Sequence, residues 1–354
     1  MSIQTHKQFA ALADEGKGQA FATAQDKADC ADIIRVGSKS FYAASRLLPS
    51  EMRFDAMSLY AFCRVSDDLV DDPRATMAAA QKLRVRINRA YEGRPDDHAA
   101  DRLFADVVRK HDIPAAVPLS MVEGFEWDLS GRCYNTIGDV IDYGARVAGT
   151  VGVMMSLLMS RRSQRTLARA CDLGVAMQLI NIARDVGEDA RNGRCYLPED
   201  WLVAEGLSSA ELIAAPHYSE ALGRVVAKLL ETADLINERA LTGIGDLPKN
   251  CQTGVRAAAL VYSAIGEQVR KNGYNSIDQR AFTTKRQKVA LLLKAYSGRW
   301  EQHTCDDAPA LDEVSYLVDA AVDPHEDPRG KTEWLLDLVG RLKSQEKLIG
   351  SRAS

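Results

Sequence analysis

The chain contains 354 residues, and 46% of them are hydrophobic, which is enough for a substantial buried core. Lysine and arginine number 45 against 49 acidic residues, so the formal net charge of −4 excludes the broad basic field of a nucleic-acid-binding protein. Seven cysteines are scattered without a CxxC pair. We therefore expect neither a zinc site nor a disulfide framework, and we expect a reducing compartment.

Two segments of the sequence, the N-terminus and the longest apolar run, indicate where in the cell the protein is located. The opening residues, MSIQTHKQFAALADEGKG, are polar and lack the apolar stretch of a secretory signal. The longest nearly apolar run, residues 147–160, is shorter than the roughly 20 residues that a membrane-spanning helix needs. We expect a cytoplasmic protein without a membrane-spanning segment.

Apolar residues recur at intervals of three and four through most of the chain, which predicts an all-α protein. We expect residues 26–340 to form a single domain between a flexible N-terminal segment at 1–25 and a flexible tail at 341–354. Three stretches have the composition of inter-helix loops, namely 92–101, 208–220 and 306–313.

One predicted helix has a stripe of polar residues near its C-terminal end. It begins after Pro49, with Ser50 as the expected N-cap, and stops before Pro73. The stripe is spaced four, three and four, so its members share one helix face, and Asp68 borders it. They are Tyr60, Arg64, Asp67 and Asp71.

These aspartates are placed unfavourably unless a cation lies beside them. Asp67 and Asp71 are one helical turn apart, where like charges repel, and Asp71 and Asp72 occupy the end at which the helix dipole disfavours anions. A bound divalent metal would remove both penalties. Oxygen ligands without histidine or cysteine favour a hard ion such as Mg²⁺, with Mn²⁺ as a second candidate. A solvated acidic helix end is the alternative interpretation.

A second, otherwise apolar helix repeats this pattern with a spacing of three, four and four. Its polar stripe consists of Gln178, Asn181, Asp185 and Asp189. Two such stripes facing each other across a bundle would line a cavity able to hold several Mg²⁺ ions and, through them, a diphosphate. Arg64 and Arg184, which lie within or beside the stripes, would either bind phosphate oxygens or form ion pairs within their own helices.

Four segments in order resemble the squalene/phytoene synthase family, and within it the bacterial phytoene synthases. They are SKSFYAASRLLP, YAFCRVSDDLVDD, VEGFEWDL with VAGTVG, and QLINIARDVGEDARNGRCYLPED. The resemblance implies an isoprenoid synthase-type helical bundle with a central cavity. It also implies Mg²⁺-dependent, head-to-head joining of two prenyl diphosphates.

The resemblance implies roles for individual residues at matching positions. The implied metal ligands are Asp67, Asp68, Asp71, Asn181, Asp185 and Asp189. The implied contacts to diphosphate or substrate are Ser38, Lys39, Ser40, Tyr60, Arg64, Gln178, Arg184, Tyr262 and Arg280. The implied catalytic residues are Asp67, Asp71, Asp185, Asp189 and Tyr262. Without the resemblance, Tyr262 would be interpreted as a core residue and Arg280 as a surface charge.

An apolar, partly aromatic wall would stabilise the carbocation that remains when diphosphate leaves. The candidates for this substrate-binding wall are Phe41, Tyr60, Tyr143 and the segment AGTVGVMM at 148–155, whose small residues would let long chains pass close to the backbone. Ordinary helix packing is the alternative interpretation of that segment.

In the family reaction, the two substrates form a cyclopropyl diphosphate, which ionises and rearranges. Loss of a proton then gives a conjugated triene; no side-chain base is evident in the sequence, and released diphosphate is the candidate base. Squalene-type members instead accept hydride from NADPH. Val70 and the VGED of the second motif favour the phytoene type, so we expect no nicotinamide cofactor.

Ser45 and Met57 are small or flexible at positions that would close a pocket, which favours C20 geranylgeranyl diphosphate over C15 farnesyl diphosphate. The expected function is therefore phytoene synthesis in carotenoid biosynthesis. The alternative within the family is a dehydrosqualene or squalene synthase acting on farnesyl diphosphate. The INIARDVGED context argues against prenyl chain elongators and terpene cyclases. A non-catalytic assembly or scaffold homologue would be expected to have lost some of the carboxylates, and all of them are present.

The C-terminal sequence TEWLLDLVGRLKSQEKL, residues 332–348, predicts an amphipathic helix. Its apolar face would dock on the bundle or rest on the inner face of a membrane, which would make the protein peripheral. The sequence does not predict an oligomeric state.

Overall fold

The computed structural model describes residues 20–37, 42, 44–72, 74–297 and 308–323. These residues form helices and no strand, which confirms the all-α prediction. The α-helices are α2 (Ala24–Gly37), α4 (Ser50–Asp71), α5 (Met77–Tyr91), α6 (Ala99–Lys110), α7 (Ala116–Leu129), α8 (Ile137–Gly144), α9 (Thr150–Leu158), α10 (Gln164–Arg191), α11 (Glu199–Ala204), α12 (Ser209–Ala214), α13 (Glu220–Thr242), α14 (Lys249–Lys271), α15 (Lys285–Tyr296) and α16 (Ser315–Ala321). The short π or 3₁₀ segments are η1 (Ala145–Gly149), η2 (Ile244–Asp246) and η3 (Asp312–Val314). The division of the chain at residues 25 and 340 stays a prediction.

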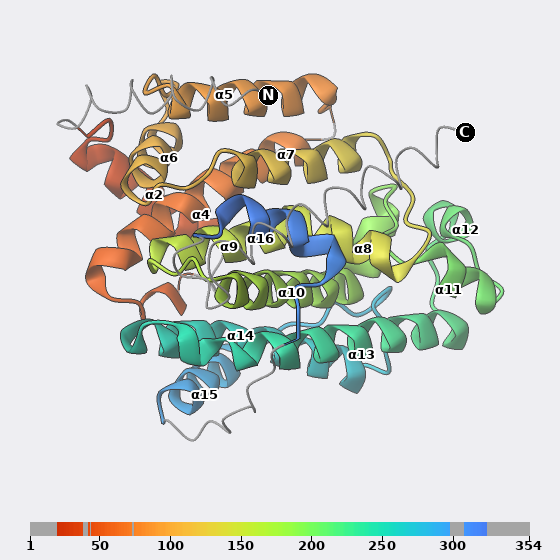
Figure 1. Ribbon diagram of the computed structural model, residues 1–354. Helices are drawn as coiled ribbons and strands as arrows, with labels where there is room; N and C mark the ends of the chain where they lie inside the picture. The colour runs from red at the N-terminus through yellow and green to blue at the C-terminus, as the bar shows by residue number, and fades with distance from the viewer. Residues whose placement is uncertain (1–19, 38–41, 43, 73, 298–307, 324–354) are drawn as a thin grey trace.

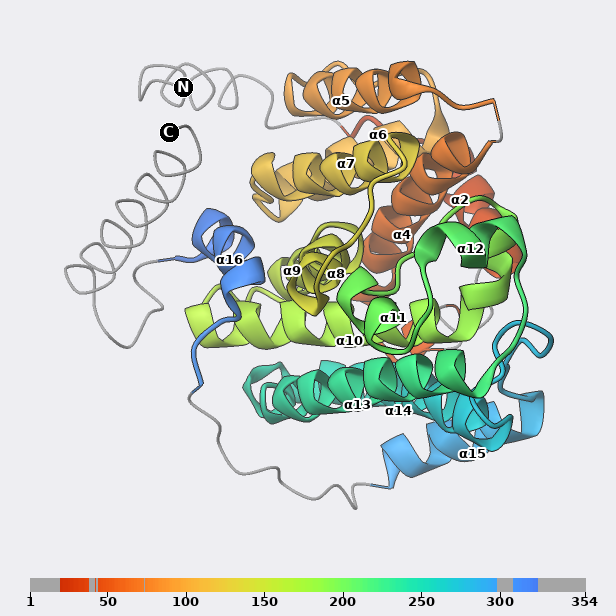
Figure 2. The same cartoon turned by 90° about the vertical axis from the view of Figure 1, so that its right-hand side faces the viewer.

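Helix α10 is the centre of the fold (Figures 1 and 2). Its 28 residues span about 42 Å, and Ser163 caps the first turn by accepting a hydrogen bond from the Thr166 backbone N–H. Helices α7 and α9 lie on one side of it and α13 and α14 on the other, with α5 and α15 outermost. A single long helix therefore contacts most layers of the bundle and carries one of the polar stripes through its middle.

Two glycines let α9 and η1 approach α10 closely. A Cβ atom on Gly152 would lie 2.1 Å from the Ala170 carbonyl oxygen, and one on Gly174 would lie 2.3 Å from that of Ala148. Neither position can accept a side chain without moving a helix. Close helix packing, the alternative interpretation of the 148–155 segment, is therefore one role of its small residues.

Two local expectations are wrong. Helix α4 has Pro49 as its N-cap, because the extended ψ of 145° occurs there and Ser50 is already the first helical residue. Residues 208–220 contain α12, whose first turn is capped by Ser208: its hydroxyl accepts from the Glu211 backbone N–H at 3.3 Å. This S-x-x-E pattern is a helix start that the loop-like composition concealed.

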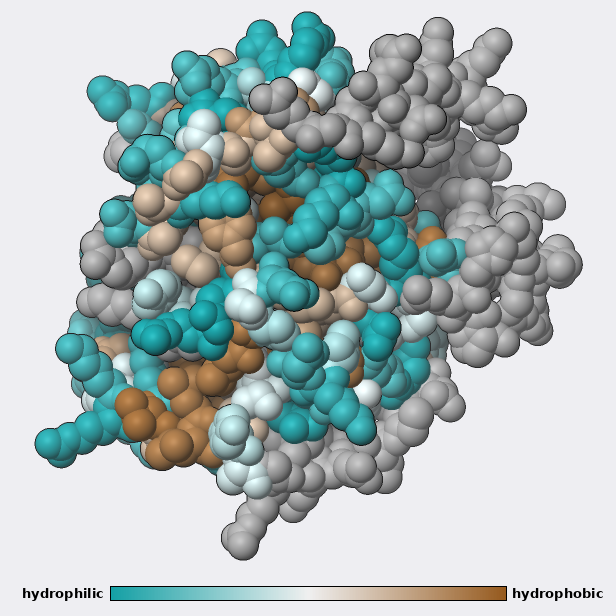
Figure 3. Space-filling model, turned by 90° about the vertical axis from the view of Figure 1, so that its left-hand side faces the viewer, coloured by the Kyte–Doolittle hydropathy of each residue, from teal (hydrophilic) through white to brown (hydrophobic). Residues whose placement is uncertain are grey.

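Helix α15 lies on the outside of the bundle, below α14 in Figure 1. The space-filling view in Figure 3 has an apolar patch at its lower left, over this helix. Among the described helices, none combines the length and the apolar character that a membrane-spanning segment needs.

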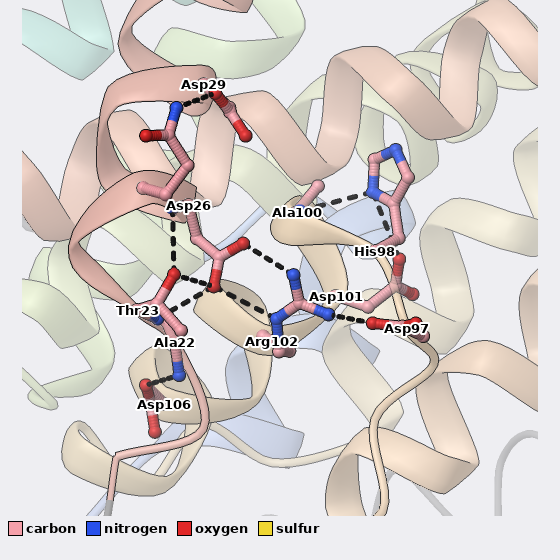
Figure 4. Close-up of polar contacts among 11 residues, drawn as sticks. Ala22, Thr23, Asp26, Asp29, Asp97, His98, Ala100, Asp101, Arg102 and Asp106 are labelled. Atoms are coloured by element: carbon pink, nitrogen blue, oxygen red, sulfur yellow. Dashed lines mark hydrogen bonds and ion pairs between the residues drawn. The ribbon is translucent and has the colours of Figure 1, made fainter.

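An ion-pair network holds α2 against α6 (Figure 4). Arg102 donates to both carboxylate oxygens of Asp26, at 2.5 and 3.0 Å, and Thr23 donates to the same carboxylate. Asp106 accepts from two backbone N–H groups of the segment that precedes α2. Asp26 is almost fully buried, and its pairing with Arg102 lowers the pKa of its carboxyl group well below the ordinary value. The network fixes the helix that leads into the SKSF segment.

Replacing Asp26 with asparagine should destabilise the protein. We expect Asp26→Asn to lower the free energy of unfolding at pH 7 by about 1.5–3 kcal/mol, because the Arg102 guanidinium loses its charged partner. A lowered pKa contributes stability above the unfolded-state value, near 4, that is lost as pH falls through the folded-state value, so the deficit should shrink as the solution is acidified below about pH 4. Urea unfolding measures both effects.

Asp29→Asn is the matched control, since Asp29 is on the same helix, is exposed and pairs with Gln25 alone among the described residues. Equal unfolding midpoints for the two variants would contradict the role given to the Asp26–Arg102 pair.

Candidate active site

Three of the four residues in the α4 stripe face a cavity, whereas the fourth, Asp71, is exposed. Arg64 donates to Asp67 at 3.3 Å and to Asp68 at 2.5 Å. It therefore forms ion pairs within its own helix, which was the alternative to phosphate binding in the sequence analysis. Tyr60, Arg64 and Asp67 line the cavity, whereas Asp68 is exposed. The carboxylate of Asp67 therefore faces inward and that of Asp68 faces solvent.

One aspartate of the α10 stripe, Asp185, accepts hydrogen bonds from two guanidinium groups. Arg184 donates to the neighbouring Asp185 at 2.8 Å, and Arg280, from the loop after α14, donates to the same carboxylate at 2.8 Å. Arg280 also forms an ion pair with Glu188 at 3.1 Å. The fold thus brings Arg280 to the second stripe, although Arg280 and Asp185 are 95 positions apart in the sequence. From its sequence context alone, Arg280 would have been interpreted as a surface charge.

Residues outside both motifs connect the region of the α4 stripe with that of the α10 stripe. Arg194, which follows α10, donates to Asp71 of α4 at 2.9 Å. Asp128, at the end of α7, accepts hydrogen bonds from Tyr143 at 3.0 Å and from Tyr196 at 2.7 Å. The negative charge of Asp128 acts on Asp67 of one stripe and on Asp189 of the other, so it lies near both.

Burial and repulsion by neighbouring carboxylates make Asp67, Asp128 and Asp189 hard to ionise, whereas Arg184 and Arg280 lower the pKa of Asp185 despite its burial. Burial, followed by the charge of Asp71, raises the pKa of Asp67 to about 6. Burial, followed by the charge of Asp185, raises the pKa of Asp189 to about 8. Burial also raises the pKa of Asp128 to about 6. The site contains more negative charge than its arginines compensate, and a divalent cation would restore the balance.

The residues present fit Mg²⁺. Aspartate and asparagine oxygens are the ligands that this ion prefers, and the side-chain oxygen of Asn181 is buried with no hydrogen-bond donor in the described part of the chain. In the same part, no three acidic, histidine or cysteine side chains are close enough to hold an ion by themselves. Water and substrate oxygens would therefore complete the coordination, as is usual for Mg²⁺ bound with phosphates.

A cavity of about 410 Å³ extends from this polar cluster into the bundle. Its polar end contains Arg64, Asp67, Gln178, Asn181 and Tyr262. The rest is lined mainly by apolar residues from the segment before α4 and from α7, η1, α9 and its C-cap, α10 and α14, including Leu48, Met121, Phe125, Val147, Val151, Met155, Met159, Leu173, Val255 and Val261. One site thus combines a charged end with a long apolar interior.

The predicted wall of the cavity is found in part. Tyr60, Tyr143 and residues from the 148–155 segment line it, although Val153 and Met154 of that segment are buried elsewhere. Ser45 also lines the cavity. The expectation for Met57 is wrong, because it packs in a separate apolar cluster with Cys30, Ala61 and Leu103.

Tyr262 lines the cavity beside Asn181 and Arg184, and burial raises the pKa of its hydroxyl. Ser38, Lys39, Ser40 and Phe41 lie outside the described residues, and so does the 332–348 segment. Their assignments stay predictions.

Sequence reasoning assigned no role to Asp128, Arg194, Tyr196 and Glu188. Asp128 and Arg194 occur in the segments VEGFEWDL and GRCYLPED, which contributed to the family resemblance. The only signal for Arg194 was its place five residues after Asp189, and helical spacing cannot use it because α10 ends at Arg191. Asp128 gave no such signal, because it has no partner on its own helix.

The chain matches the family model for squalene/phytoene synthase over residues 34–287. It belongs to the squalene/phytoene synthase family. This match covers α4, α10, α14 and the loop with Arg280, and hence every described element of the candidate site.

Individual relatives support the same assignment. The chain is 44% identical over 346 residues to a phytoene synthase from Cereibacter sphaeroides, covering 92% of this chain and 97% of the relative. It is 44% identical over 326 residues to a phytoene synthase from Rhodobacter capsulatus, covering 90% and 96%.

Solved structures show the same fold. A dehydrosqualene synthase in complex with a ligand superimposes with a TM-score of 0.71 at 29% identity, covering 77% of this chain and 96% of that one. A squalene synthase from Alicyclobacillus acidocaldarius gives a TM-score of 0.65 at 24% identity, covering 71% and 95%. The predicted isoprenoid synthase-type bundle with a central cavity is confirmed.

The position of Arg280 depends on a glycine of α10. Gly187 donates its backbone N–H to the Ser276 carbonyl at 3.0 Å, and a Cβ atom on Gly187 would lie 2.7 Å from backbone atoms of Ile277. We expect Gly187→Ala to displace the loop, separate Arg280 from Asp185, lower turnover and cost about 1–3 kcal/mol of stability. Steady-state kinetics and thermal unfolding measure these effects.

Gly266→Ala on α14 is the control, because its Cβ atom would make only an ordinary contact at 3.5 Å with Leu230. If both variants behave like the unmodified protein, the loop does not depend on close approach at Gly187.

Proposed function

We propose that this protein is a phytoene synthase that joins two molecules of geranylgeranyl diphosphate head to head. The observation that carries the proposal is the cavity, which has a charged end between two aspartate-bearing helices and an interior that is mainly apolar. The names of two relatives, each 44% identical over most of the chain, support it. The product would be phytoene, formed through a cyclopropyl diphosphate with release of diphosphate, in carotenoid biosynthesis.

The two ends of the cavity suit the two parts of a prenyl diphosphate. The diphosphate groups would lie between Asp67 and Asp71 of α4 and Asp185 and Asp189 of α10, together with Mg²⁺ or Mn²⁺. When bound, the metal ions would supply positive charge for the leaving diphosphate. The prenyl chains would extend into the apolar interior, where burial of each methylene group favours binding.

Guanidinium groups would stabilise the charge that develops on the leaving group. Arg64, Arg184 and Arg280 are already held beside the site by carboxylates. A diphosphate can accept hydrogen bonds from the same groups, so binding would exchange one set of oxygens for another with little movement. The Tyr262 hydroxyl, whose raised pKa keeps it protonated, is a further donor at the polar end.

The aromatic wall would protect the carbocation from water. Tyr60, Phe125 and Tyr143 line the cavity, and ring faces stabilise positive charge. Tyr143 donates its hydroxyl to Asp128, which fixes the ring orientation. Loss of a proton, with released diphosphate as the candidate base, would end the reaction without a nicotinamide cofactor.

A second candidate function is dehydrosqualene synthesis from farnesyl diphosphate. The solved dehydrosqualene synthase at 29% identity favours it. Ser45, which lines the cavity, still favours the longer C20 substrate, whereas Met57 no longer bears on the choice. We further propose a cytoplasmic location with peripheral contact to the inner face of the membrane.

A product assay separates these functions. Purified protein with Mg²⁺ and no nicotinamide is given geranylgeranyl diphosphate or farnesyl diphosphate, and the hydrocarbon is identified by mass spectrometry. We expect a C40 triene from the C20 substrate. If only a C30 product forms, the protein is a dehydrosqualene synthase instead. If neither substrate gives a hydrocarbon, the result favours a scaffold role or dependence on NADPH.

Either aspartate motif should be indispensable for turnover. We expect Asp67→Asn and Asp185→Asn each to lower kcat about a hundredfold or more, because each removes a charge that holds metal and diphosphate. Circular dichroism should show unchanged helix content. Asp29→Asn, remote from the site, should keep full activity, and near-normal turnover in both motif variants would refute the metal assignment.

A further inference from the structure

Helix α15 presents an apolar stripe to the outside of the bundle. Val289, Leu293 and Tyr296, spaced four and three, are 57%, 65% and 77% exposed, and Phe282 just before the helix is 71% exposed. Figure 3 shows the resulting apolar patch. The opposite side of α15 packs on α14, and Ala295 is its buried residue. Large apolar side chains gathered on one exposed helix face mark an interaction surface.

This stripe is bordered by positive charge. Residues 281–296 contain Lys285, Arg286, Lys288 and Lys294 and no acidic residue, although the whole chain has a net charge of −4. Lys285, Arg286 and Lys294 are exposed, and no carboxylate of the described residues pairs with them. The surface therefore offers unneutralised cations to an anionic partner.

We propose that α15 docks this protein on an anionic lipid bilayer. An exposed helix with an apolar stripe between cations is the pattern of helices that lie in the membrane interface. The apolar side chains would enter the region below the headgroups while the cations contact lipid phosphates, and Tyr296 would lie at the interface.

A second copy of the chain fits this surface less well. Two-fold pairing would bring the same patch of each copy together and would place the cations of one α15 against those of the other. Docking on a bilayer brings the cations to opposite charge instead. The inference specifies the surface for the peripheral membrane contact proposed above and does not depend on the proposed reaction. It would place α14, which lines the cavity with Val255, Ala258 and Val261, one helix layer from the membrane.

Vesicle sedimentation tests the proposal with the full-length protein. Sucrose-loaded vesicles of phosphatidylcholine, with or without about 30 mol% phosphatidylglycerol, serve as probes. The test variant is Val289→Asp with Leu293→Asp. The matched control is Val203→Asp with Leu235→Asp, which changes a valine and a leucine of similar exposure, 62% and 64%, on α11 and α13. Both variants add the same charge, so only the position differs.

We expect the unmodified protein to bind the anionic vesicles and the test variant to partition at least about tenfold more weakly, with the control unchanged. Lys285→Gln with Lys294→Gln, which leaves the apolar stripe intact, should also weaken binding about tenfold or more, and added salt should do the same.

Several results would overturn the proposal. Failure of the unmodified protein to sediment with anionic vesicles would refute it. Equal binding by the α15 variants and the control would also refute it and would assign the membrane contact to another segment, such as 332–348. A dimer in analytical ultracentrifugation that only the α15 variants dissociate would assign the stripe to a second copy.

Discussion

Repulsion among partly buried carboxylates is the constraint on which the site depends. Burial is the largest cause of the raised pKa of Asp67, Asp128 and Asp189, which come from three different helices. Neighbouring carboxylates add to it, since Asp71 acts on Asp67 and Asp128, and Asp185 and Asp128 act on Asp189. Such an arrangement costs folding free energy, since each added negative charge opposes the others. It persists because the surrounding helices are packed too closely to separate, and because a cation at this point would turn repulsion into attraction.

Close helix packing supplies the rigidity that this arrangement needs. Gly152 and Gly174 let α9, η1 and α10 meet at backbone distance, and Gly187 does the same for α10 and the Arg280 loop. The same helices enclose the apolar cavity, so the charged end and the apolar interior are positioned by one set of contacts. A substrate with an anionic head and a long apolar tail is complementary to both ends at once.

The sequence predicted the parts of the site that one helix determines. Helical spacing was enough to align Asp67 with Asp71 and Asp185 with Asp189, because neighbours at one turn share a face. It could not identify Asp128 or Arg194, whose partners lie on other helices, and it misplaced Met57, whose side of α4 faces α2 and α6 instead of the cavity. Residues that depend on tertiary neighbours leave no periodic signal, and family resemblance alone pointed to Tyr262 and Arg280.

The central claim is that the α4 and α10 carboxylates bind metal and diphosphate as one unit. The most direct measurement is the melting temperature of the protein with Mg²⁺, with inorganic diphosphate, and with both. The account predicts a large increase only when both are present, abolished equally by Asp71→Asn on α4 and Asp189→Asn on α10, since a ligand stabilises only the state that binds it. A full increase that survives in either variant would show that one helix suffices and would contradict the account.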